Sequence, residues 1–404
     1  MLDILVAGGG YVGLSVAVSI KKAAPHLNIM VADGAPADSW MKDGRASAIA
    51  AAASRMLSAL GVWDEILPHA QPINKMIITD SRTADPVRPV FLTFDGDVAE
   101  GEPFAHMVPN PAMVGSLIRL ATELGVDLRF STIVEHFTNE PASVKARLST
   151  GETISARLLV ACDGVKSKLR DLAGIKTVHF DYGQAGIVTT VEHERPHDGV
   201  AEEHFLPAGP FAILPLRDNR SSLVWTERTD DAERLVASDD LVFEEELERR
   251  FGHKLGTLKV VSGRRAFPLG LTLARAFVAD RIALAGDSAH GIHPISGQGL
   301  NLGFKDVAAL AETIIDADRL GLDIGSLAVL ERYQSWRRFD TFRMGVTTDV
   351  LNRLFSNDIT PIRIARDFGL GLVERMPGLK SFFIKQAAGV SKGGSPKLLE
   401  GVLP

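Results

Sequence analysis

Cysteine is nearly missing from this chain of 404 residues, which carries only Cys162. A single cysteine excludes an internal disulfide and suits a reducing compartment. An excess of positive charge is missing as well. The formal net charge is −6, whereas proteins that bind nucleic acids are usually basic, so we expect no nucleic-acid partner.

Long apolar runs are also missing. No stretch of 18 residues is apolar throughout, and the sequence therefore predicts no transmembrane helix. The chain starts with a strand-like segment that lacks the basic region and apolar core of a signal peptide. We therefore expect a cytoplasmic protein, with peripheral contact at the inner membrane face left open. At 404 residues, the chain is long enough for two domains.

Glycine is present where it is informative, first in the segment Gly-Gly-Gly-Tyr-Val-Gly at residues 8–13. An apolar run, Ile4–Ala7, precedes this segment, and an alanine-rich amphipathic stretch, Leu14–Ala24, follows it. This strand–turn–helix setting predicts a dinucleotide site. Gly8 permits the tight turn, Gly10 lets the backbone approach a pyrophosphate, and Gly13 lets helix and strand pack closely.

Asp33 follows a second apolar run and can accept hydrogen bonds from a ribose hydroxyl. These features leave NAD and FAD open as ligands. Two later apolar strands end in an acid beside a glycine, at Asp163-Gly164 and at Gly286-Asp287. Open α/β sheets place their ligand-binding groups at such strand ends.

A second glycine-rich turn follows Asp287 and precedes a helix predicted from about Leu302 to Ile315. The start of a helix stabilises negative charge, so this turn predicts a second ligand contact far along the chain. A ligand that reaches both turns must be long, which favours FAD. Its adenosine would lie at Asp33 and its isoalloxazine ring at residues 297–301.

Together with Arg45, the block from Gly286 to Asp306 and the strand Gly209–Leu216, these motifs resemble the flavin-dependent aromatic monooxygenases of the para-hydroxybenzoate hydroxylase type. Within that family they are most similar to the ubiquinone-biosynthesis hydroxylases, and the resemblance covers essentially the whole chain. It implies an α/β fold. A Rossmann-like FAD-binding domain is interleaved with a largely antiparallel β-sheet substrate domain, and C-terminal helices follow.

The resemblance also implies the reaction. NAD(P)H reduces FAD, O2 adds at the flavin C4a carbon, and one oxygen atom passes to the ring of a polyprenylated phenol. A membrane surface or a ubiquinone-biosynthesis complex is an implied partner. Two alternatives stay open: a hydroxylase of a small soluble aromatic compound, and a non-catalytic FAD-binding scaffold.

The candidate site follows from the same motifs. No metal is required, and no catalytic residue is assigned, with His290 a weak candidate because a histidine near a flavin can tune substrate protonation. The expected cofactor-binding residues are Gly8, Gly10, Gly13, Asp33, Arg45, Asp163, Gly286, Asp287, Pro294, Gly297, Gln298, Gly299, Leu300 and Asn301.

The domains are expected to interleave. We assign residues 1–74, 105–180 and 270–345 to the FAD-binding domain, 75–104 and 181–269 to the substrate domain, and 346–404 to a helical C-terminal region. Dense apolar and β-branched residues predict strands at 76–79, 90–94, 185–191, 211–216 and 222–226.

Two helices carry further expectations. Asp239–Phe251 is predicted to be a helix with Leu241, Phe243, Leu247 and Phe251 on one apolar face. Another helix is predicted to begin at Pro361. Its apolar stripe with interspersed arginine and lysine suits either a cap on the flavin domain or a basic amphipathic surface that meets lipid.

Overall fold

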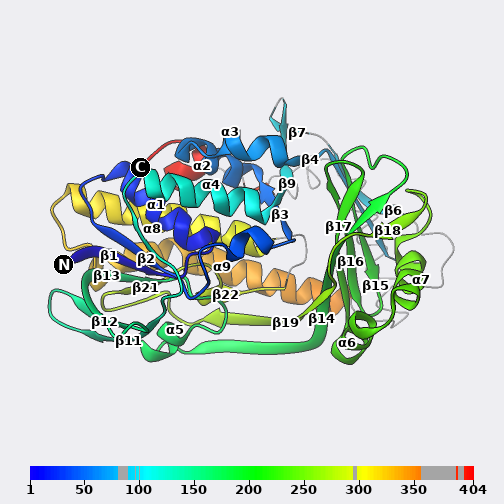
Figure 1. The fold of residues 1–404 in the computed structure, drawn as a ribbon. Coiled ribbons are helices and arrows are strands. Elements are labelled where there is room, and N and C mark those ends of the chain that lie inside the picture. Colours follow the sequence, from blue (N-terminus) through cyan, green and yellow to red (C-terminus); the bar gives the residue numbers. More distant parts are fainter. Residues whose placement is uncertain (81–89, 96, 100, 294–297, 356–387, 390–394) are drawn as a thin grey trace.

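The computed structural model describes residues 1–80, 90–95, 97–99, 101–293, 298–355, 388–389 and 395–404. These residues form two main sheets, one largely parallel and one largely antiparallel, with helices against each (Figure 1). The chain passes back and forth between the two sheets. The predicted α/β fold with an interleaved antiparallel sheet is therefore confirmed.

The parallel sheet has the strand order β10-β2-β1-β13, with β21 beside the carboxyl half of β13. The central strand β1 is apolar and buried from Ile4 to Ala7, because helices or further strands cover both faces there. Helix α1 packs against both α4 and α8 on one face. The bounds are β1 (Leu2–Ala7), α1 (Tyr11–Ala23), β2 (Ile29–Ala32), α4 (Asn110–Glu123), β10 (Asp127–Arg129), β13 (Thr153–Ala161), β21 (Ile282–Leu284) and α8 (Gln298–Arg319), with antiparallel additions β11 (Val134–Asn139), β12 (Val144–Leu148) and β20 (Val278–Ala279).

The second sheet has the order β22-β19-β14-β17-β16-β15-β5-β6, and only the pair β15 and β5 is parallel. We call it the substrate sheet. It takes strands from four separate stretches of the chain, which explains the interleaving. The bounds are β5 (Lys75–Asp80), β6 (Val90–Asp95), β14 (Thr177–His193), β15 (Val200–Leu206), β16 (Gly209–Leu216), β17 (Arg220–Arg228), β19 (Arg265–Ala274) and β22 (His290–Gly291), with β18 (Leu258–Val260) beside β14.

Side chains of the substrate sheet alternate between two environments. In β16, Phe211 and Ile213 enter a core under α6 (Thr229–Ala237) and α7 (Asp240–Phe251). Ala212 and Leu214, between and beside them, line a cavity on the opposite face. This is the two-residue period of a strand. One face of the sheet builds its own core, and the other is left for the site.

The predicted helix at Asp239–Phe251 is α7, and Asp239 caps it by accepting a hydrogen bond from the Val242 N–H at 2.9 Å. Phe243, Leu247 and Phe251 are buried as expected. Leu241 is not, because its side chain is 78% exposed. It is two residues from Phe243, which places it about 200° around the helix from the buried stripe.

Three long elements cross the expected domain limits. Strand β14 continues through residue 181, β19 through residue 270, and helix α9 (Leu327–Phe355) through residue 346. Figure 1 shows β14 and β19 running side by side from one half of the molecule to the other. The two halves therefore share continuous strands, and the division into domains stays a prediction.

A smaller sheet, β3 (Ala46–Ala50), β9 (Ala105–Pro109) and β4 (Gln71–Ile73), lies between the halves, beside α2 (Ala51–Leu60) and α3 (Trp63–Ile66). The remaining elements are α5 (Lys168–Leu172) and the hairpin β7 (Asp97–Ala99) and β8 (Glu102–Pro103). Near the carboxyl end, Leu398 and Leu399 are buried in the core of the parallel-sheet half. The helix predicted from Pro361 lies outside the described residues. Among the helices of the described chain, none is long and apolar enough to span a bilayer.

Candidate cofactor and substrate site

A cavity of about 840 Å³ lies between the parallel sheet and the substrate sheet. Its volume is within the usual range for small-molecule sites, about 300–1,000 Å³. One wall consists of the glycine loop, the strand ends of the parallel sheet and the first turn of α8, and we call it the nucleotide wall. The other consists of side chains from β5, β6, β14, β15, β16 and β17 with part of α9, and we call it the sheet wall.

The three glycines of the first motif have different neighbours. Gly8 has φ of +110°, and a Cβ there would lie 2.2 Å from the carbonyl oxygen of Cys162. A Cβ on Gly13 would lie 1.9 Å from the Gly8 carbonyl oxygen. A Cβ on Gly10 would meet nothing within 4 Å. Gly8 and Gly13 are therefore required by the protein itself, whereas Gly10 keeps open space beside the cavity.

Helix α1 begins at this loop without a side-chain cap, and its first turn contains no acidic residue. Its free N–H groups and dipole favour an anion at the cavity. Asp33 also lines the cavity and accepts a hydrogen bond from the Gly9 N–H at 2.7 Å. The nucleotide wall thus places an anion-binding helix start beside a carboxylate that can accept from a ribose hydroxyl.

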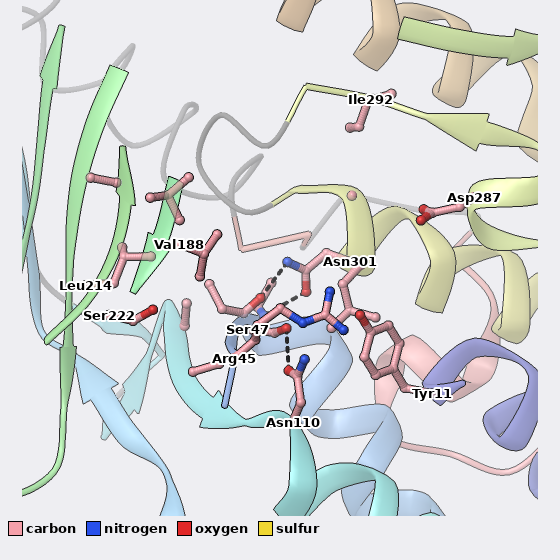
Figure 2. Close-up of a pocket in the computed structure, with 18 of the residues that line it drawn as sticks. Tyr11, Arg45, Ser47, Asn110, Val188, Leu214, Ser222, Asp287, Ile292 and Asn301 are labelled. Carbon is pink, nitrogen blue, oxygen red and sulfur yellow. Dashed lines mark hydrogen bonds between the residues drawn. The ribbon is translucent and has the colours of Figure 1, made fainter. Parts of the chain in front are cut away.

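Arg45 lies on the loop before β3, and Figure 2 shows it extending toward Tyr11. Its Nε and Nη2 atoms each donate to Asp43 at 2.8 Å. Asn110 holds this loop, since its Nδ2 donates to Asp43 at 3.0 Å and its Oδ1 accepts from the Ser47 hydroxyl at 2.8 Å. The ion pair with Asp43 therefore fixes the Arg45 guanidinium at the cavity wall.

The first turn of α8 meets the cavity through Gly299, Leu300 and Asn301. The Asn301 side chain ties this turn to β3, because its Oδ1 accepts from the Ala50 N–H and its Nδ2 donates to the Ala48 carbonyl, both at 2.9 Å (Figure 2). The side-chain amide of Asn301 therefore has a structural role. The two hydrogen bonds hold a second helix start against the same cavity as α1.

Asp287 lies at the carboxyl end of β21 and lines the cavity. Burial raises the pKa of its carboxyl, although His290 and Arg45 act in the opposite direction. A hydrogen bond holds the preceding residue in place, because the Gly286 N–H donates to Asp306 Oδ2 at 2.9 Å. Asp306 in turn pairs with His290 and accepts from Arg337 Nε at 2.8 Å.

Two predicted site residues lie elsewhere. His290 is fully buried, is bonded to Asp306 and does not line the cavity, so its position argues for a structural role. Asp163 is exposed and is also absent from the cavity lining, although the adjacent Gly164 belongs to it. Two side chains instead bond to the start of α5: Ser167 accepts from the Arg170 N–H at 3.0 Å, and Asp163 Oδ2 accepts from the Leu169 N–H at 3.4 Å. Pro294 and Gly297 lie outside the described residues, and Gln298 begins α8.

The sheet wall is mostly apolar. Glu203, Ser222 and Thr226 are its polar members on the substrate sheet, and Thr347 and Thr348 are those on α9. Its apolar members are Met76, Ile78, Leu92, Phe94, Val188, Ala201, Phe205, Pro210, Ala212, Leu214, Val224 and Met344. The cavity therefore joins a polar, anion-binding wall to a wall suited to hydrocarbon.

The comparisons with known proteins agree with this geometry. Residues 1–338 match the family described as FAD binding domain. The ubiquinone hydroxylase UbiL of Rhodospirillum rubrum is 45% identical over 99% of this chain and 93% of that protein. The chain belongs to the FAD-dependent hydroxylases of ubiquinone biosynthesis. It is thus a flavin-dependent aromatic monooxygenase.

Two further likenesses place this hydroxylase more broadly. The 3-demethoxyubiquinol 3-hydroxylase of Escherichia coli strain K12 is 33% identical over 96% of this chain and 98% of that protein. The crystal structure of p-nitrophenol 4-monooxygenase PnpA from Pseudomonas putida has the same fold. It superposes with a TM-score of 0.80 at 19% identity, over 98% of this chain and 99% of that one.

The residues of the hydroxylase fit FAD. Two helix starts without acidic side chains in their first turns, at α1 and α8, face one cavity with the Asp33 carboxylate at its edge. The space kept open at Gly10 is the position where a pyrophosphate needs to approach. In the part of the chain that the structure describes, no group of three His, Cys, Asp or Glu side chains could hold a metal ion.

Sequence reasoning missed part of the site in this hydroxylase. Tyr11 lies inside the glycine motif yet points its ring at the cavity, and burial raises its pKa. Asn110 and the α9 residues Met344 and Thr348 also line the cavity. The position of Tyr11 between two motif glycines was an available signal. The others depend on tertiary packing that no local pattern reveals.

Proposed function

We propose that this chain hydroxylates the aromatic ring of a polyprenylated phenol in ubiquinone biosynthesis, with NAD(P)H and O2 as co-substrates. The observation that carries the proposal is the pairing of two unlike walls in one cavity. An anion-binding nucleotide wall suits FAD, and an apolar wall suits an aromatic ring with a hydrocarbon tail.

The apolar wall is larger than a small phenol requires. It extends over six strands of the substrate sheet, from β6 and β5 at one edge to β14. Burying each methylene of an isoprenoid tail contributes about 0.8 kcal/mol, so such a wall favours a prenylated substrate over a short soluble one. The polar groups on this wall are few enough to orient one ring.

Bound FAD would supply the activation of O2 and the transfer of one oxygen atom. The residues of the chain position the bound groups and stabilise charge in the cavity. The first turn of α8 directs N–H groups to the cavity and stabilises negative charge there. Arg45, paired with Asp43, adds a fixed guanidinium on the same wall. The apolar side chains of the sheet wall exclude water from the reacting ring.

Helix α9 supports a peripheral membrane contact as part of this proposal. Thr347 lines the cavity and is exposed, so the cavity reaches the surface beside α9. About a quarter turn around the same helix, Phe339 is 75% exposed and Phe342 is 60% exposed, with Val346 and Val350 continuing the stripe. An apolar stripe beside the mouth suits a substrate that resides in lipid.

The reaction is tested by mass-spectrometric quinone profiles of cells that lack the gene. We expect a prenylated phenol that lacks one oxygen atom to accumulate. A plasmid with the wild-type gene should remove it, and a plasmid with Gly10→Glu should not, because the added carboxylate repels the pyrophosphate. Rescue by Gly10→Glu without bound FAD would contradict a catalytic role that depends on FAD. An unchanged quinone pool would favour a small soluble substrate.

The membrane contact is tested by flotation of the holoenzyme with vesicles of phosphatidylethanolamine and phosphatidylglycerol. The wild type and a Leu320→Ser control, which changes an exposed leucine at the end of α8, should float equally. The double variant Phe339→Ser, Phe342→Ser should lose most of the bound fraction. Equal flotation of all three proteins would remove α9 from the proposal.

A further inference from the structure

Buried polar groups that face the cavity identify where a ligand supplies a missing hydrogen bond. Among the described residues that line the cavity, two buried side chains have polar atoms without a hydrogen-bond partner. They are His293, at both ring nitrogens, and Thr226, at its hydroxyl. A buried polar group without a partner costs about 1–3 kcal/mol, so a native structure keeps one where a ligand binds.

The His293 imidazole lines the cavity and follows β22, the edge strand of the substrate sheet, by two residues. It is fully buried, and its ring packs edge-on against Tyr182 of β14, with ring centroids 5.4 Å apart. Tyr182 is fixed because its hydroxyl donates to Asp349 of α9 at 3.0 Å. The neighbouring Ile292 instead approaches the first turn of α8, where a Cβ on Gly299 would lie 3.9 Å from Ile292 Cγ1.

The protonation state of His293 suits a neutral partner. Burial lowers the pKa of this imidazole to about 4, so the ring is neutral at pH 7. A neutral imidazole has one N–H donor and one acceptor nitrogen. A phenolic hydroxyl likewise donates one hydrogen bond and accepts others. The two groups are therefore complementary without transfer of charge into the cavity.

We propose that His293 is the hydrogen-bond partner of the substrate's phenolic hydroxyl, which orients the ring for hydroxylation; this rests on the proposed function. Thr226 competes as the partner, since its hydroxyl is the second unpaired group on the cavity wall. FAD competes as the ligand of His293. The packing of His293 against Tyr182 of β14, which Asp349 of α9 holds in place, favours the phenol.

The test uses the oxidised holoenzyme without NAD(P)H, so that no turnover occurs. Binding of 2-prenylphenol and of its methyl ether is followed by the change in flavin absorbance, for wild type, His293→Leu, His293→Gln and Thr226→Val. We expect the wild type to bind the phenol about tenfold more tightly than the ether, the loss that one hydrogen bond explains. In His293→Leu the two affinities should agree within about twofold, and His293→Gln should restore part of the difference.

Thr226→Val should keep the full preference, and no variant should change FAD affinity. Because the His293 nitrogens have no partner, His293→Leu should not lower the thermal unfolding temperature, as removing a structural histidine would. Equal affinities in the wild type would overturn the proposal without any variant. So would a preference lost only in Thr226→Val, or FAD affinity lost in His293→Leu. If the wild type binds neither ligand, the proposed function itself fails.

Discussion

The two walls of the cavity are built by different means. The nucleotide wall is made by backbone: the glycine loop at residues 8–13, two helix starts and two strand ends. The sheet wall is made by alternate side chains of strands whose other face forms a separate core. A change to the nucleotide wall therefore disturbs backbone that cannot move. The effect of a substitution in the strands of the sheet wall depends on whether the side chain faces the cavity or the separate core.

The comparison also explains why one wall is easier to recognise than the other. A pyrophosphate is the same in every FAD site, so the glycines that approach it recur as a motif. Binding of a hydrocarbon tail requires only apolar side chains of suitable size, and many combinations of residue types provide them. The nucleotide wall can therefore be recognised from a sequence motif. The sheet wall shows only the two-residue alternation of side chains in its strands.

The largest effect is expected at Gly13→Ala. The new Cβ would lie 1.9 Å from the Gly8 carbonyl oxygen, where only backbone could yield, so we expect the variant to lose more than about 3 kcal/mol and to fold poorly. Gly10→Ala is the matched control, because its Cβ enters open space. Gly10→Ala should have the same urea midpoint of unfolding as the wild type, yet it should bind FAD at least tenfold more weakly. Equal unfolding of both variants would contradict the division between the two glycines.

The sheet wall is tested by two neighbouring residues of β17. Leu223 lies in the core under α6 and α7, so Leu223→Ala should reduce the free energy of unfolding by about 3 kcal/mol. Val224 lines the cavity, and Val224→Ala should cost less than about 1 kcal/mol while it weakens binding of a prenylated phenol. Urea unfolding and ligand titration measure both quantities. A larger stability loss in Val224→Ala would mean that the two faces are assigned the wrong way round.

A smaller effect is expected from pH. The pKa of His293 is about 4 in the folded protein and about 6.5 in the unfolded chain, so the unfolded chain binds a proton more readily between these values. Stability is therefore complete above pH 6.5 and falls as the pH drops toward 4. His293→Leu should remove on the order of 2 kcal/mol of this loss between pH 6.5 and 4.5. Parallel pH profiles of urea unfolding for the two proteins would show that the site is not desolvated.

The smallest effect concerns two helix starts. In α7 the Asp239 carboxylate caps the helix, so Asp239→Ala should cost about 1 kcal/mol. In α1 no side chain caps the start, which faces the cavity instead. Added FAD should therefore raise the thermal unfolding temperature of wild type and Asp239→Ala by the same amount. A smaller FAD-induced shift in Asp239→Ala would show that the two helix starts are coupled.

Much of this arrangement could be predicted from the sequence, and the reasons are local. The glycine loop, the helix α7 and the strands around Phe211 and Val224 each follow from short-range patterns. The position of Asp163 outside the cavity could not be predicted, because only tertiary geometry separates it from the adjacent Gly164, which lines the cavity. The roles of Asn110 and α9 depend on contacts between distant segments.

The bond between Asn301 and β3 has a consequence for biosynthesis of the protein. The Asn301 side chain bonds the first turn of α8 to Ala48 and Ala50, and β21 completes the parallel sheet beside β13. A ribosome synthesises the first β-strand long before it reaches these residues. Nascent chains therefore expose apolar strands until the second helix start emerges, and contacts so distant in sequence form slowly. Flavin capture is then a late event, and cells with little chaperone capacity should accumulate the apoprotein as aggregate.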